Sequence, residues 1–111
     1  PKDLATAQAF SDPPLNLAPA ERPGEVCAFR AHHLRPGRAG GGQLGFTARV
    51  EGSDITGSET FVRLNADGRS WIMLLHGVHD FEPGAPLDVH VEPSRLLRFQ
   101  TGEAPQTAGS V

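Results

Sequence analysis

Three histidines and an aspartate could form a metal site: His76, His79, Asp80 and His90. Zinc needs three or four ligands that converge at about 2 to 2.2 Å, and paired histidines gain that convergence from helical spacing. Here His76 and His79 flank a glycine at the end of a predicted strand, and His90 follows one strand later, facing outward. The pattern favours surface histidines at loop edges, and we expect no metal.

Two carboxylates close in sequence, Asp54 and Glu59, are candidates for acid–base chemistry. Such a pair needs contrasting environments that separate the two pKa values, which the sequence does not indicate, so solvated loop carboxylates are favoured. The nearby Gly-Ser corners at residues 52–53 and 57–58 lack the Gly-x-Ser-x-Gly frame of a nucleophile elbow. They could present backbone amides to a small oxyanion, so Ser53 and Ser58 define an alternative, ligand-binding function.

Residues 39–42, AGGG, suggest a glycine-rich phosphate loop. A phosphate loop needs a lysine and a following helix whose N-terminal amides face the anion. No lysine follows here and a strand comes next, so a flexible hairpin loop is expected. Without a nucleotide motif or a catalytic frame, we expect that this stretch is not an enzyme by itself.

Composition limits the class of protein further. The chain has 111 residues, enough for one domain with a single core, and a net charge of −3 that argues against nucleic-acid binding. Its one cysteine, Cys27, stands among apolar residues and is expected to be a buried thiol. The longest apolar run, residues 71–75, is far shorter than the roughly 20 residues of a membrane-spanning helix. No leader for export opens the chain, which starts at Pro1 as a piece of a longer protein would.

The elements that would position these residues are short strands. The apolar pattern predicts strands at residues 26–30, 44–51, 60–65, 71–75, 87–92 and 95–99, with a kink or bulge at 52–57 and a helical segment at 3–10. Short strands separated by turn signals, with no long amphipathic helix, are typical of an antiparallel barrel or sandwich. We predict an all-β, small OB-like antiparallel barrel with a short N-terminal helical segment.

The best-specified element is a hairpin around Asp67-Gly68, a dipeptide that accepts the positive φ angles of a tight turn. Its first arm alternates between apolar and polar residues, but its second arm is apolar on both faces. Trp71 lies on one face of that arm, and Ile72 and Leu74 lie on the other. One face can join the core, so the other needs a cover, and we expect the domain to work by contact with protein.

Several short motifs occur in the order of one known family. They are residues 10–16, FSDPPLN, residues 29–34, FRAHHL, residues 57–60, GSET, the pair Pro83-Gly84, and residues 95–99, RLLRF. In this order the chain resembles the C-terminal regulatory extension, the TOBE domain, of the ATP-binding subunits of maltose-type and glycerol-phosphate-type ABC importers. Ala31 and His32 replace a proline and a glutamate of the family motif, whereas Arg30 and His33 match it.

The resemblance implies a domain order, a location and partners. Residues 1–24 would be the end of a preceding ATPase domain with a linker, and residues 25–111 the OB-like regulatory domain, on the cytoplasmic side of a bacterial plasma membrane. Partners would be a second copy of the subunit, the permease through the ATPase domain, and a regulatory protein in some cases. ATP and Mg would bind the ATPase domain, so no cofactor is expected in this stretch.

The function implied is a regulatory and dimerisation domain of a carbohydrate-type importer. Its candidate contact residues are Arg30, His33, Glu59, Trp71, Ile72 and Leu74. The alternative is a sensor of a small oxyanion or sugar, of the type found in molybdate transporters, with Ser53 or Ser58 at the site. Oligonucleotide binding, which some OB folds perform, disagrees with the negative charge.

Overall fold

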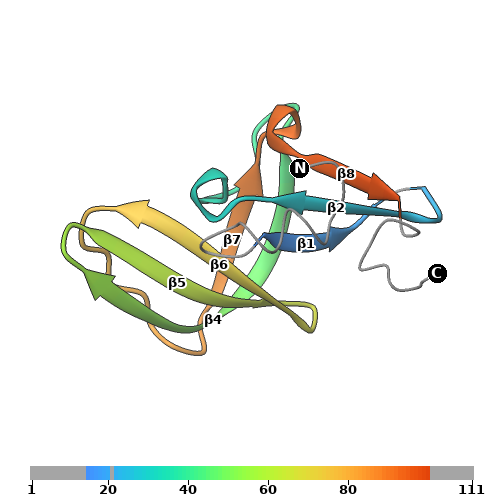
Figure 1. Cartoon of the computed structure of the whole chain (residues 1–111). Coiled ribbons are helices and arrows are strands. Elements are labelled where there is room, and N and C mark those ends of the chain that lie inside the picture. The colour runs from blue at the N-terminus through green and yellow to red at the C-terminus, as the bar shows by residue number, and fades with distance from the viewer. Residues whose placement is uncertain (1–14, 21, 101–111) are drawn as a thin grey trace.

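The fold is built almost entirely from antiparallel strands (Figure 1). The computed structural model describes residues 15–20 and 22–100. Its strands are β1 Asn16–Pro19, β2 Glu25–Phe29, β3 Arg35–Pro36, β4 Leu44–Thr56, β5 Glu59–Ala66, β6 Arg69–His76, β7 Pro86–Val91 and β8 Leu97–Gln100. Two single 3-10 turns, η1 Ala31–His33 and η2 Pro93–Arg95, complete it. Neither of these described helical turns is long or apolar enough to cross a membrane.

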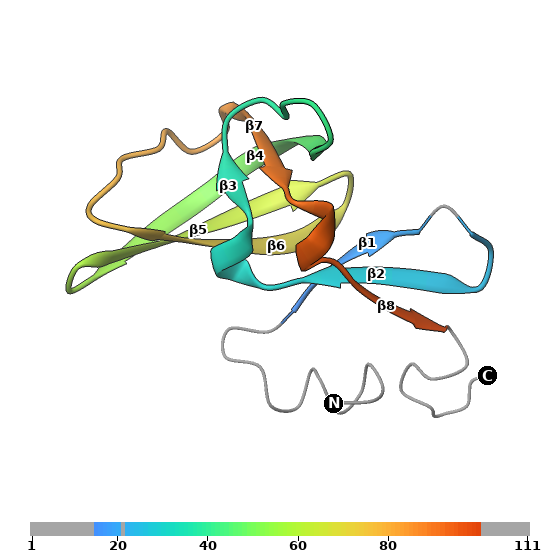
Figure 2. The same cartoon turned by 90° about the horizontal axis from the view of Figure 1, so that it is seen from above.

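The strands form two sheets that curl around one core (Figure 2). One sheet has the order β1-β2-β8, and the other has the order β3-β7-β4-β5-β6. Phe29, Phe46 and Trp71 meet between the sheets, with ring centroids 5.0 and 4.9 Å apart in edge-to-face pairs around the tryptophan. The predicted antiparallel, OB-like barrel is confirmed. The helical segment predicted at residues 3–10 lies outside the described residues.

The β5–β6 hairpin has the predicted turn and the predicted alternation. Asp67 and Gly68 have φ angles of 54° and 87°, the positive pair of a tight hairpin turn. On β6, Trp71 and the other odd-numbered apolar residues are buried, whereas Ile72 and Leu74 are only half-buried on the opposite face. The excess apolar surface seen in the sequence is therefore real and lies on the outside of the sheet.

β4 agrees in part with its prediction of a kink or bulge at residues 52–57. A bulge is present, but the strand has 13 residues and continues to Thr56. The irregularity is a bulge between Val50 and Gly52, after which β4 pairs with β5 in register. Gly52 is buried, and the space beside it holds the guanidinium of Arg63, so the glycine accommodates a side chain without ending the strand.

β1 was not predicted, because its residues were assigned from the sequence to the end of a preceding domain and a linker. Asn16–Pro19 pairs with β2 along its whole length. The Asn16 side chain also reaches the backbone of Ile72 on β6, and the indole Nε1 of Trp71 donates to the Leu17 carbonyl oxygen at 2.8 Å. β1 therefore joins the two sheets at one side of the barrel.

Candidate functional site

The outer face of β5 and β6 carries an apolar strip, which we call the contact face. It consists of Phe61, Ile72 and Leu74, all half-buried. Phe61 lies opposite Leu74 and Arg63 lies opposite Ile72 in the hairpin register, so these side chains share one side of the sheet. Arg63 pairs with Asp54 of β4 and closes the strip with a charged border. Antiparallel pairing and the period of two thus assemble this face.

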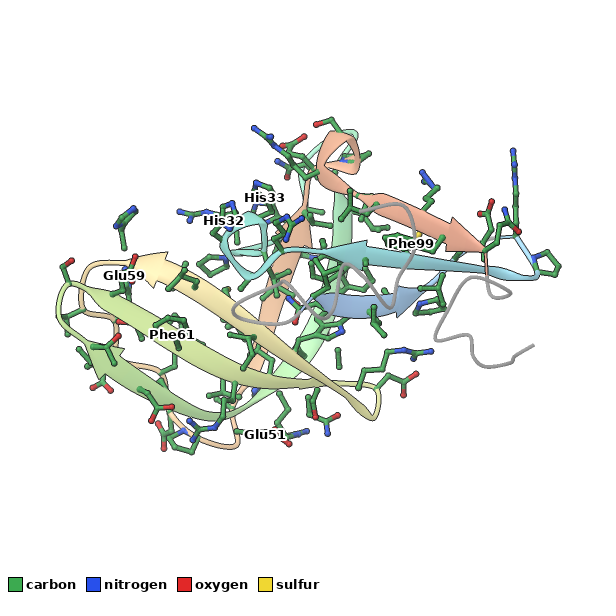
Figure 3. All side chains as sticks on the ribbon, in the orientation of Figure 1. His32, His33, Glu51, Glu59, Phe61 and Phe99 are labelled. Atoms are coloured by element: carbon green, nitrogen blue, oxygen red, sulfur yellow. The ribbon has the colours of Figure 1, made fainter. Side chains whose placement is uncertain are left out.

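A hollow of about 310 Å³ opens at one end of the contact face. Its lining residues are His32, Arg35, Glu59, Leu74 and His76, which come from η1, β3, β5 and β6. Figure 3 shows His32 and His33 together on η1, with Glu59 on the same side of the molecule. Three nitrogen-bearing side chains and one carboxylate surround the apolar Leu74, so the hollow suits a partner side chain that has both apolar and acidic parts.

His33 is the electrostatically unusual residue next to this hollow. Its ring nitrogen Nδ1 is buried and makes no hydrogen bond within the described chain. Burial lowers the pKa of His33 below 6.5, and the charges of His32, Arg95 and Arg30 lower it further. The ring of His32 lies 4.0 Å from that of His33. His33 therefore stays neutral among arginines at neutral pH.

The structure brings together most of the contact residues expected from the sequence. Glu59 and Leu74 line the hollow, and Ile72 extends the contact face beside them. Arg30 and His33 lie at η1, which packs against β6. Trp71 must be removed from this set, because its side chain lies in the core and is only 2% exposed.

The remaining candidates of the sequence are used in other ways. The His79 ring nitrogen Nε2 lies 2.7 Å from the carbonyl oxygen of His76, and Nδ1 of His90 lies 3.0 Å from that of Gly37. Over residues 15–20 and 22–100, no group of three or more histidine, cysteine or acidic side chains is arranged to hold a metal ion. Asp54 is bound to Arg63 on the sheet surface, separate from the hollow that Glu59 lines.

The two proposed oxyanion corners differ in their surroundings. Ser53 pairs with Val62 inside the β4–β5 ladder, and the space over the preceding Gly52 is filled by the Arg63 guanidinium. Ser58 lies in the tight β4–β5 turn, where its carbonyl oxygen accepts a hydrogen bond from the Gly77 amide at 2.6 Å. The first corner is therefore closed by a side chain, and the second is engaged through its backbone.

His32, Arg35, His76 and Phe61 are site residues that the sequence does not single out together. They stand on separate elements and meet only through the pairing of β5 with β6 and the packing of η1 on β6. The one local signal for the contact face is the apolar character of Ile72 and Leu74. It indicates a covered surface but does not indicate which charged side chains surround that surface.

The fold and the contact face define a small OB-like β domain with an apolar strip on its outer surface. The family model for the TOBE domain matches residues 27–99, so the chain belongs to the TOBE domain family. No curated protein matches the chain. Membership of this family indicates a regulatory or ligand-binding domain of an ABC transporter ATPase.

Proposed function

We propose that this domain is the regulatory and dimerisation domain of the ATP-binding subunit of a carbohydrate-type ABC importer of the maltose and glycerol-phosphate kind. It acts by protein contact. The observation that carries the proposal is the contact face, where Phe61, Ile72 and Leu74 keep apolar surface exposed outside the core. An apolar centre with a polar border is the usual anatomy of a protein interface.

A second copy of the same domain is the partner that the charges favour. Glu59 lies in the same hollow as Arg35 and two histidines, so the face offers both an acidic and a basic group. A two-fold interface places the same patch on both subunits and so requires self-complementarity. Glu59 of each copy can then approach Arg35 of the other while the Leu74 side chains meet between them.

The wider assignment follows from the role of such a domain within a subunit. ATP and Mg bind the preceding ATPase domain, which also contacts the permease subunits on the cytoplasmic side of the plasma membrane. The domain has no catalytic step of its own and keeps the ATPase halves associated. A regulatory protein would use the surface next to η1, where Arg30 and His33 lie.

Introducing a charge on the contact face tests the proposal. We expect Leu74→Glu to weaken self-association of the 111-residue chain by at least about tenfold in sedimentation equilibrium, because a carboxylate would be buried against its own copy. The matched control is Ile55→Glu, which places the same charge on a side chain that is 52% exposed, opposite Thr60 and away from the contact face. Thermal unfolding monitored by circular dichroism is the control for folding of both variants. A chain that stays monomeric at about 1 mM, or a Leu74→Glu variant that associates as the parent does, would contradict the proposal.

A further inference from the structure

A second and larger hollow, which we call the end groove, opens beside the β1–β2 turn. It has a volume of about 700 Å³ and lies between the β1-β2-β8 sheet and the start of β4. Figures 1 and 2 both show the β1–β2 turn at the opposite end of the molecule from the β4–β5 turn that precedes Glu59. The end groove is therefore separate from the contact face, and an inference about it goes beyond the proposed function.

The end groove exists because the inner face of the three-stranded sheet changes character along its length. Ala18 and Phe29 on this face are buried in the core, and Cys27 beside Ala18 in the ladder is also buried. The same face also carries Arg98, which lies opposite Cys27 in the ladder. It carries Glu25 as well, because Glu25 lies two residues before Cys27 on β2. Charged side chains at inward positions cannot join an apolar core, so the two sheets separate there.

The floor of the end groove is apolar and its border is charged. Cys27, Phe46 and Leu96 form much of the floor. Leu44, which is 38% exposed, extends the floor outward. A cavity of several hundred Å³ with an apolar lining and a few polar groups has the size and composition of a small-molecule site.

Two arginines and one carboxylate stand at the border: Arg22, Arg98 and Glu25. Within the described residues, neither guanidinium forms an ion pair with a carboxylate. Among the lining residues that the structure describes, two arginines and one glutamate give a net charge of +1. Gln43, also at the border, donates to Glu92 and accepts from the Gly40 amide, so its side-chain amide is already engaged.

We propose that the end groove binds a small amphipathic monocarboxylate, with its hydrocarbon part on Phe46 and Leu96 and its carboxylate between Arg22 and Arg98. A guanidinium donates two parallel hydrogen bonds to a carboxylate, which fixes the orientation of the ligand. One negative charge balances the described charges of the border, whereas a dianion such as a phosphate monoester would leave an excess negative charge beside Glu25. Such a ligand would lie on Phe46, which contacts Trp71, so the groove connects to the core of the barrel.

Titration of the full chain with hexanoate, followed by amide NMR, tests the inference. We expect the amides of Phe46, Leu96 and Arg98 to shift in a saturable way, with a dissociation constant below about 10 mM. Acetate keeps the charge but lacks the apolar part, and 1-hexanol keeps the apolar part but lacks the charge. Both should bind at least about fivefold more weakly than hexanoate, because each fills only half of the site.

A charge-neutral variant separates groove binding from general attraction to arginine. Arg98→Gln should weaken hexanoate binding about tenfold, since it removes a charge-assisted hydrogen bond. Arg69→Gln, at an exposed arginine that does not line the groove, should leave binding unchanged. The inference is overturned if no saturable shift occurs below about 10 mM, if Arg98→Gln binds as the parent does, or if 1-hexanol binds equally well. None of these outcomes changes the self-association test.

Discussion

The side chain of Asn16 forms two hydrogen bonds with the backbone of Ile72. Its Nδ2 donates to the Ile72 carbonyl oxygen and its Oδ1 accepts from the Ile72 amide, both at 2.8 Å. Asn16 is 2% exposed, so the amide is removed from water, and both its nitrogen and its oxygen are engaged in this pair. A side chain thus takes the place of a neighbouring strand at the edge of β6, over a sequence distance of 56 residues.

Asn16→Ala should therefore be strongly destabilising for its size. It leaves the backbone amide and carbonyl of Ile72 without their Asn16 partners in a part-buried position, and we expect a loss of about 2 to 4 kcal/mol in the free energy of unfolding by urea denaturation. Asn65→Ala is the matched control. It removes an amide that caps the hairpin turn by accepting from the Gly68 amide, in an exposed position, and should cost about 1 kcal/mol or less. Equal losses for the two variants would show that the Asn16 bonds contribute little.

Gly52 is a glycine because of a neighbouring side chain. A Cβ at this position would clash with the guanidinium of Arg63, which also pairs with Asp54. The clash involves the end of a flexible side chain that is 46% exposed, so Gly52→Ala should cost only about 1 kcal/mol. In an Arg63→Ala background the same change should be nearly neutral. A double-mutant cycle by urea denaturation measures this coupling, and additive effects would contradict the explanation.

His33 should make stability depend on pH. Its pKa in the folded state is lowered below 6.5 by burial and by its cationic neighbours, so the unfolded chain binds this proton more readily. The free energy of unfolding should therefore rise with pH between the lowered pKa and 6.5, and become independent of this residue above that value. Urea denaturation from about pH 5 to about pH 8 measures the slope. His33→Gln should reduce it, whereas His90→Gln keeps His33 intact and should retain that contribution.

The turn of the central hairpin depends on a glycine conformation. Gly68 has a φ of 87°, so Gly68→Ala should cost about 1 kcal/mol in thermal or urea unfolding. Gly41→Ala is a suitable comparison, because a Cβ there meets no atom within 4 Å. It should be neutral or stabilising by a few tenths of a kcal/mol, through the unfolded chain alone. Equal effects at the two positions would contradict a contribution of the Gly68 conformation to stability.

Local sequence signals predicted the central hairpin. The elements that were not predicted, β1 and the second half of β4, depend on pairing between distant residues. Asp67-Gly68 specifies the turn because these two residue types accept the positive φ angles that a tight hairpin turn needs. β1 was not predicted, because Asn16–Pro19 is short and contains a proline, and its pairing with β2 gives no local signal. Of the kink or bulge expected at residues 52–57, the bulge occurs between Val50 and Gly52, and the rest is strand because residues 52–56 pair with β5.

The candidate site shows the same limit. The exposed apolar positions Ile72 and Leu74 followed from the alternation of β6, since a strand with two apolar faces must show one of them outside the core. The charges around them could not be predicted, because Arg35 and His76 are brought together by sheet order and by η1. Trp71 could have been assigned to either face until the core was known.

The cap that Asn16 places on β6 also limits how this domain can assemble. β6 is a terminal strand of the five-stranded sheet, and a terminal strand with free backbone groups invites another chain to extend it without end. With the backbone of Ile72 already engaged, a neighbouring strand cannot pair with the middle of β6. The proposed association through side chains of the contact face is thereby favoured over extension of the sheet strand by strand.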